Sequence, residues 1–190
     1  TAELATLELD LKADGWTVLR TDVSRTASVS SIRSIVQSAY NADPANVKAL
    51  YMVGHVPVPY SGSVNPDGHS EHQGAWPSDT YYADVNGTWT DNSVNIITAQ
   101  RVENRNIPGD GKFDQSDLPS AAEVQVGRVD LYDMPAFGLS ELELTRAYLN
   151  KAHSFKIKGF TPQVRGIVFD NFQYTGYPLA AGGIRTIAPL

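Results

Sequence analysis

The segment of residues 46–60 constrains the fold more than any other part of this chain. Within it, a short and mostly apolar run at residues 47–53 ends abruptly at Gly54 and His55 and is followed by two prolines. This pattern is typical of a central strand that is buried on both faces. In an open parallel sheet, binding and catalytic groups gather beyond the carboxyl ends of the strands. We therefore expect a functional site close to His55.

Composition limits the partners that this chain can have. The 190 residues, 42% of them hydrophobic, suit one α/β domain with a real core. The net charge of -6 and the absence of Lys or Arg runs argue against nucleic acid and anionic membranes as partners. No stretch approaches the ~20 apolar residues of a membrane span. Because the chain has no cysteine, it cannot contain a cysteine nucleophile.

The first 23 residues predict a helix and then a strand. Leu4, Leu7 and Leu11 recur at helical spacing and Gly15 follows them, which is typical of a helix that ends just before a glycine. We expect its apolar stripe to lie on the sheet. Residues 16–23 alternate between two faces, which predicts a strand.

A second helix should connect this strand to residues 47–53. It has a possible cap at Ser28 or Ser30, an end at residues 41–44, and an apolar stripe made by Ile32, Ile35, Val36 and Tyr40. The three elements form a βαβ unit. Because such crossovers are right-handed, strands 16–23 and 47–53 should be neighbours in a mostly parallel sheet flanked by helices.

Residues 55–122 lack periodicity and predict a long loop or hairpin insertion. Long loops in compact domains are usually functional or built around a ligand. Asn86-Gly87 is a hairpin-turn signal, so residues 80–84 and 87–90 should form a small hairpin.

Regular structure should resume after the insertion. Residues 123–129 and 164–169 read as strands. Ser140 and Glu143 form a capping box for a helix that runs to about residue 155, with Leu144, Tyr148 and Ala152 among its buried side chains.

Residues 106–117 offer the oxygen ligands of a twelve-residue calcium loop. If Gly111 is the sharp-turn glycine, the ligand positions fall on Asn106, Asp110, Asp114, Asp117 and the carbonyl of Lys112. The Gly-Asp-Gly-Lys core resembles the calcium loop of dockerin modules, but Pro108 occupies a ligand position and the last ligand is Asp rather than Glu. Three residues just before the loop offer oxygens for the same cation or a second one: Asp84, Asn86 and Asp91. The alternative is a solvated acidic turn.

Four further side chains are candidates for a polar or metal site. His69 and His72, with Asp67 nearby, carry groups that zinc accepts, although their spacing matches no established zinc pattern; the alternative is a polar loop packed against Trp76. His55 and Asp79 follow predicted structure in positions that suit a strand-end site. No activated nucleophile accompanies His55, so a structural role is favoured for it, and a capping role is favoured for Asp79.

Three short motifs together are similar to the gingipain-like cysteine peptidases. They comprise Val-Gly-His with Pro57 soon after, Ser-Asp followed by Tyr at residues 78–82, and a Gly-Arg strand at residues 126–129. The resemblance implies a caspase-like α/β fold in two subdomains and a structural calcium ion. Residues 1–159 would then be the first subdomain, and residues 160–190 the start of a truncated second one.

In that family the catalytic cysteine and histidine lie in the second subdomain, so the resemblance assigns no catalytic residue to this chain. Because both ends look cut, we expect a piece of a longer, secreted protein in which this scaffold subdomain supports a downstream catalytic one. The rival interpretation is a non-enzymatic, calcium-stabilised surface or assembly module. A third is a metal-dependent hydrolase that uses His69 and His72.

Overall fold

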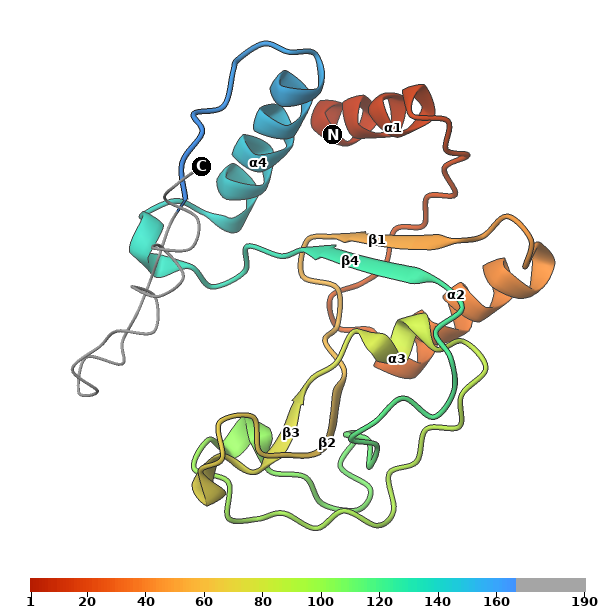
Figure 1. Cartoon of the computed structure of the whole chain (residues 1–190), viewed down its shortest axis with the longest axis vertical. Helices are drawn as coiled ribbons and strands as arrows, with labels where there is room; N and C mark the ends of the chain where they lie inside the picture. Colours follow the sequence, from red (N-terminus) through yellow and green to blue (C-terminus); the bar gives the residue numbers. More distant parts are fainter. Residues whose placement is uncertain (167–190) are drawn as a thin grey trace, which may run out of the picture. The chain divides into compact units, whose positions relative to one another are not determined.

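The computed structural model describes residues 1–166 and has a mixed α/β fold (Figure 1). The chain divides into two compact units, residues Thr1–Lys151 and Ala152–Leu190. The elements in chain order are α1 (Ala2–Ala13), α2 (Val29–Ala42), β1 (Ala49–Val53), β2 (Tyr60–Val64), η1 (Ser70–His72), β3 (Gly74–Pro77), α3 (Thr80–Ala83), η2 (Val102–Asn104), β4 (Gln125–Val129), η3 (Pro135–Phe137) and α4 (Glu141–Lys156), where η marks a short 3₁₀ helix.

A small parallel sheet of β1 and β4 lies at the centre of the first unit. Its register runs from Ala49 opposite Gln125 to Val53 opposite Val129. Met52 is buried against α2, whereas Tyr51, on the other face, is 41% exposed. Both strands, and the parallel direction of the sheet, agree with the sequence patterns, although residues 16–23 were the expected partner of β1. The expectation that β1 is buried on both faces is wrong, because one face retains solvent access at Tyr51.

The strand expected at residues 16–23 is wrong. These residues connect α1 to α2 without joining a sheet, and the neighbour of β1 is β4. Trp16 and Leu19 remain exposed, and Arg20 is held by the carboxylates of Glu8 and Asp22. The alternation in this segment therefore has no buried face to pack.

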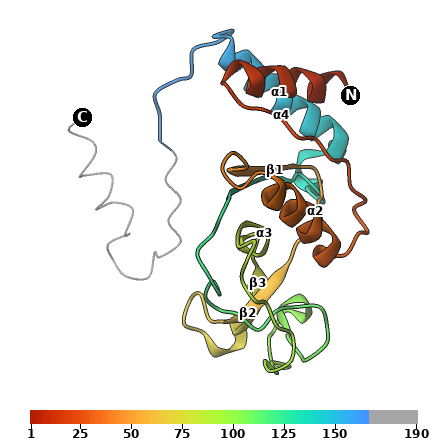
Figure 2. The ribbon, with the colours of Figure 1, turned by 90° about the vertical axis from the view of Figure 1, so that its right-hand side faces the viewer.

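Both predicted N-terminal helices are present with the expected ends. In α2 the hydroxyl of Ser28 accepts a hydrogen bond from the Ser31 N–H at 3.1 Å, which makes Ser28 the cap, and Ile32 and Val36 are buried. In contrast, α1 has no buried residue. Its expected packing on the sheet is wrong, because α1 lies beside α4 (Figure 2), where Glu3 pairs with Arg146 at 3.2 Å.

The hairpin of this chain is formed by β2 and β3, which pair antiparallel with an irregularity between Ser61 and Val64. The hairpin expected around Asn86-Gly87 is wrong, since residues 80–83 form the single helical turn α3. Neither Asn86 nor Gly87 has the positive φ that a two-residue hairpin turn requires. The glycine serves another purpose, because a Cβ on Gly87 would lie 2.1 Å from a carboxylate oxygen of Asp84.

An aromatic cluster connects the irregular segment to the sheet. Tyr81 stacks on Phe113 with ring centroids 4.2 Å apart, and Trp89 meets both rings edge-on. Tyr82 is completely buried, and its hydroxyl donates to the carbonyl of Pro57 at 2.6 Å. This cluster packs against Met52 and holds a segment that has little regular structure of its own.

The predicted capping box at the start of α4 is confirmed. The Glu143 carboxylate accepts from the N–H and the hydroxyl of Ser140, and the Glu143 N–H donates back to the Ser140 hydroxyl. Leu149 is the buried residue of this helix, whereas the residues expected there are half-buried: Leu144, Tyr148 and Ala152. Of the strand expected at residues 164–169, the first three residues are not in a strand and the rest lie outside the described residues. Within residues 1–166, every helix is too short or too polar to cross a lipid bilayer.

Candidate functional site

The first candidate site is a polar cluster at the carboxyl ends of β1 and β4. Gly54 ends β1 with φ of +88°, and its N–H donates to the carbonyl of Val129 at 2.8 Å. His55 follows, and its Nδ1 lies 2.8 Å from Oδ2 of Asp130, the residue after β4. The imidazole also stacks on Tyr132 with ring centroids 4.0 Å apart. The segment directly after β4 thus contacts the His55 ring at both its edge and its face.

Arg128 and Asp79 make the strongest contact of this strand-end cluster. Nε and one terminal nitrogen of the guanidinium each lie 2.8 Å from a different carboxylate oxygen, which is a bidentate ion pair. Arg128 also donates to the carbonyls of Val56 and Pro57, the segment directly after His55. Burial alone would lower the pKa of Arg128, but the hydrogen bonds and the charge of Asp79 raise it above its usual value. The guanidinium therefore stays charged and joins β4 to two segments.

Sequence reasoning selected His55 and Asp79 and missed their partners. Asp79 begins α3 without a side-chain capping hydrogen bond, so its carboxylate serves Arg128 rather than the helix. Arg128 and Asp130 were detectable as charged residues within and just after a predicted strand. Among residues 1–166, no serine or threonine hydroxyl is hydrogen-bonded to His55.

Two of the predicted calcium ligands, Asp91 before the loop and Asp114 within it, organise the backbone of the irregular segment. Asp91 accepts from the N–H groups of Gly109 and Gly111, each at 2.7 Å. Asp114 accepts from the hydroxyl of Thr90 and from three successive backbone N–H groups, those of residues 92–94. Burial works to raise the pKa of Asp114, but these hydrogen bonds together hold it well below its usual range.

The other predicted calcium ligands occupy separate positions. Asp84 is buried and accepts from Gly87 and Ser120, while Asn86 is held by Glu123. Asp110 accepts from the N–H groups of Ile107 and Lys112, and the Lys112 ammonium lies 3.5 Å from the same carboxylate. Asp117 lies in an exposed turn.

Asn106 is the predicted ligand that differs from the rest. It is fully buried, its amide nitrogen donates to the carbonyls of Gly62 and Phe113, and its Oδ1 has no hydrogen-bond partner. Within the described residues, the loop carboxylates do not converge into a group of three, and calcium binding stays a prediction.

A second cluster lies in the connection between β2 and β3. One ligand atom from each of Asp67, His69 and His72 falls within 4.8 Å of the others. Oδ2 of Asp67 is 2.6 Å from Nδ1 of His72 and 3.2 Å from Nδ1 of His69. Hydrogen bonds from His72 and His69 hold the pKa of Asp67 far below its usual range, and the bond to Asp67 raises the pKa of His69. No described contact joins this cluster to His55 or Asp79.

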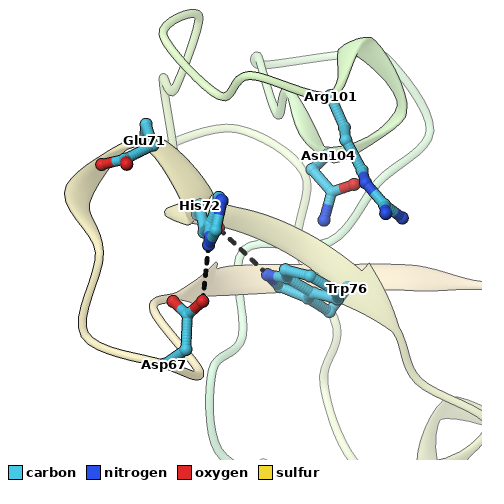
Figure 3. A pocket seen from close by; sticks show the side chains of 6 residues that line it. All are labelled: Asp67, Glu71, His72, Trp76, Arg101 and Asn104. Carbon is cyan, nitrogen blue, oxygen red and sulfur yellow. Dashed lines mark hydrogen bonds and ion pairs between the residues drawn. The ribbon is translucent and has the colours of Figure 1, made fainter. Parts of the chain in front are cut away.

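A cavity of about 260 Å³ adjoins the Asp67–His69–His72 cluster (Figure 3). Trp76 forms a wall, and its Nε1 donates to the carbonyl of His72 at 3.3 Å. The remaining lining residues are Asp67, Glu71, His72, Arg101 and Asn104. The alternative that this loop packs against Trp76 is therefore compatible with the structure, and so is a ligand site.

Comparison with known proteins supplies no relative from which a function can be transferred. No protein-family model, curated protein or solved structure matches this chain. The function must therefore be argued from the two clusters themselves.

Proposed function

We propose that this chain is the supporting first subdomain of a secreted, gingipain-like cysteine peptidase. In this proposal β1 and β4 belong to the parallel sheet of a caspase-like fold, residues 55–122 are an insertion, and residues 160–190 open the catalytic subdomain. That downstream subdomain is the partner of this chain and supplies the thiolate and the histidine base that attack a peptide carbonyl.

The single observation that carries the proposal is the bidentate pair of Asp79 and Arg128. These residues belong to the Ser-Asp and Gly-Arg motifs of the resemblance, which lie 49 positions apart in sequence, and they contact each other directly. A contact between two motif residues gives a physical reason for both motifs: they lock the strand end and the segment after His55 into one geometry.

The chemistry of the strand-end cluster favours support over catalysis. Arg128 forms ion pairs with both Asp79 and Asp130, and the three side chains are 14–25% exposed. Groups that are already paired and partly buried resist rearrangement, which suits a rigid base for a neighbouring subdomain. They do not supply a free nucleophile.

A peptidase assay on the full gene product tests this function. We expect cleavage of peptide substrates that a thiol alkylator abolishes, and no cleavage by residues 1–190 alone. Cleavage that survives the alkylator would overturn the cysteine-peptidase proposal. So would proteolysis by residues 1–190 alone.

The second candidate is a non-enzymatic surface or assembly module on the same scaffold. It rests on the same ion pair of Asp79 and Arg128 and needs no reactive group from a downstream subdomain. A full gene product that contains the downstream cysteine and histidine but fails to cleave peptides would select this candidate over the first.

Both candidates include a structural calcium ion in the loop of residues 106–117. Support comes from the buried Oδ1 of Asn106, because a carbonyl oxygen without a partner is a costly feature that a cation would compensate. A ligand at ~100 times its dissociation constant stabilises the folded state by about 2.7 kcal/mol. We expect added calcium to raise the melting midpoint of the chelator-treated chain.

Two variants make the calcium test specific. Asp110→Asn alters a proposed ligand and should remove the calcium-dependent shift, whereas Glu103→Gln removes one exposed charge outside the ligand set and should retain it. A calcium shift that is the same in both variants, or absent from the unaltered chain, would remove calcium from the proposal.

A further inference from the structure

The geometry of the β2–β3 connection places three metal-binding side chains on one side of a short turn. His69 precedes η1 and His72 ends it, with the His72 N–H donating to the His69 carbonyl at 3.0 Å. Because a 3₁₀ helix has three residues per turn, side chains three positions apart eclipse each other. Asp67 reaches the same side from the preceding turn, where its Oδ1 also accepts from the His69 N–H at 3.2 Å.

The three donor atoms lie close enough together to share one metal ion. Zinc binds imidazole nitrogen and carboxylate oxygen at about 2.0–2.2 Å, which separates neighbouring tetrahedral donors by about 3.3 Å. The Asp67–His69 and Asp67–His72 donor separations are 3.2 Å and 2.6 Å. To bind zinc, the carboxylate of Asp67 and the two imidazole rings need only move slightly apart. The zinc ion then replaces the protons that lie between the carboxylate and the Nδ1 atoms.

The adjoining cavity supplies an independent sign that a ligand binds here. Asn104 is only 5% exposed, yet its Nδ2 has no hydrogen-bond partner, and its side chain lines the cavity that His72 and Asp67 border (Figure 3). A buried donor without a partner is costly unless a ligand accepts from it. Asn104 is held close to β3, because Gly74 has no side chain to keep the Asn104 backbone carbonyl away. A Cβ on residue 74 would lie 2.1 Å from that carbonyl oxygen.

The other lining side chains indicate the chemistry of that ligand. Arg101 borders the cavity, and no contact within the described residues engages its guanidinium. Together with Asn104 Nδ2 it offers N–H donors and a positive charge, which suit a carboxylate once a bound metal offsets the charges of Asp67 and Glu71 in the same lining. The indole of Trp76 forms an apolar wall beside them.

We propose that Asp67, His69 and His72 bind a zinc ion whose fourth coordination position faces this cavity and accepts a small carboxylate held by Arg101 and Asn104. Three protein ligands with one exchangeable position is the arrangement of zinc sites that bind a substrate or ligand. The site is independent of the gingipain-like proposal, since it uses neither the strand-end cluster nor the calcium loop.

Calorimetric titration of zinc into the chelator-treated full chain tests the metal site. We expect one zinc per chain. Asp67→Asn and His72→Ala should each weaken binding by about tenfold or more, since loss of supporting groups alone costs about 10–100-fold. Glu103→Gln also removes one negative charge, but Glu103 is exposed and belongs neither to the ligands nor to the cavity lining, so this variant should bind zinc within about twofold of the unaltered chain. Failure to bind zinc, or equal weakening in Glu103→Gln and Asp67→Asn, would overturn the proposal.

A spectroscopic measurement keeps the test decisive if a variant fails to fold. Cobalt(II) in place of zinc in the unaltered chain should give the intense visible absorption of a tetrahedral site with nitrogen and oxygen ligands. A weak octahedral spectrum would overturn the assigned geometry.

The carboxylate part of the proposal has its own test. Acetate should change the spectrum of the cobalt-loaded chain, and its neutral isostere acetamide should not. Asn104→Ala and Arg101→Gln should each weaken acetate binding by about fivefold or more. Both variants should leave the affinity for zinc within about twofold of the unaltered chain. Acetate binding that neither variant alters would refute the assigned roles of Arg101 and Asn104.

Discussion

Replacing Arg128 by methionine should destabilise the protein strongly, because it leaves Asp79 partly buried without its partner. The two side chains are 14% and 25% exposed and share two hydrogen bonds of 2.8 Å. Breaking a buried pair by removing one partner costs about 3–5 kcal/mol. Since this pair keeps some solvent access, we expect about 3 kcal/mol for Arg128→Met, measured by urea unfolding.

A double-mutant cycle separates the ion pair from the other contacts of Arg128. Arg128→Met combined with Asp79→Asn should cost less than the sum of the single changes, with a coupling energy of about 1.5 kcal/mol or more. Arg20→Met is the matched control, because Arg20 is 40% exposed and its partners Asp22 and Glu8 are 80% and 28% exposed, and exposed pairs contribute about 0–1 kcal/mol. Equal costs for Arg128→Met and Arg20→Met, or a coupling energy near zero, would refute the argument that the pair locks the strand end.

Three further changes test the packing and the irregular segment. Tyr82→Phe should cost about 1 kcal/mol in unfolding experiments, since it removes the hydroxyl that donates to the Pro57 carbonyl. Gly74→Ala should cost about 1–3 kcal/mol because the new Cβ collides with the Asn104 carbonyl, and a neutral effect would contradict that close approach. Asp114→Asn should lower the melting midpoint above pH 4 and reduce its dependence on acid pH. Because the pKa of Asp114 is lower in the folded chain than its value of about 3.9 in the unfolded chain, its contribution to stability is present above pH 4 and is lost as the pH falls. An unchanged dependence of the melting midpoint on acid pH would contradict the stabilising role of these hydrogen bonds.

Local signals in the sequence were sufficient for the three longer helices, α1, α2 and α4. The cap at Ser28 and the capping box of Ser140 with Glu143 act between residues three apart, so their geometry follows from the helix itself. The strands β1 and β4 could also be predicted, because a strand with one packed face needs apolar side chains on that face. The Asp67–His69–His72 cluster was visible for the same reason, since its members lie within one turn of the chain.

Pairings between distant segments were beyond local patterns. The alternation at residues 16–23 resembles a strand, but β1 takes β4 as its neighbour, and nothing in the alternation itself encodes that choice. Asn86-Gly87 is a hairpin signal by itself. The buried Asp84 carboxylate overrides it, because Asp84 receives the Gly87 N–H and leaves no room for a side chain.

The sequence by itself determined which residues are candidates for a site: the histidines at 55, 69 and 72, the acidic loop and the Ser-Asp and Gly-Arg motifs. The tertiary structure alone decided what those residues contact. It brought Arg128 to Asp79 and Asp130 to His55, and it set Asn104 into the cavity beside His72. The physical reason is that residue type fixes charge and hydrogen-bonding capacity, whereas partner choice depends on which backbone segments the packing of β1, β4 and the aromatic cluster brings within reach.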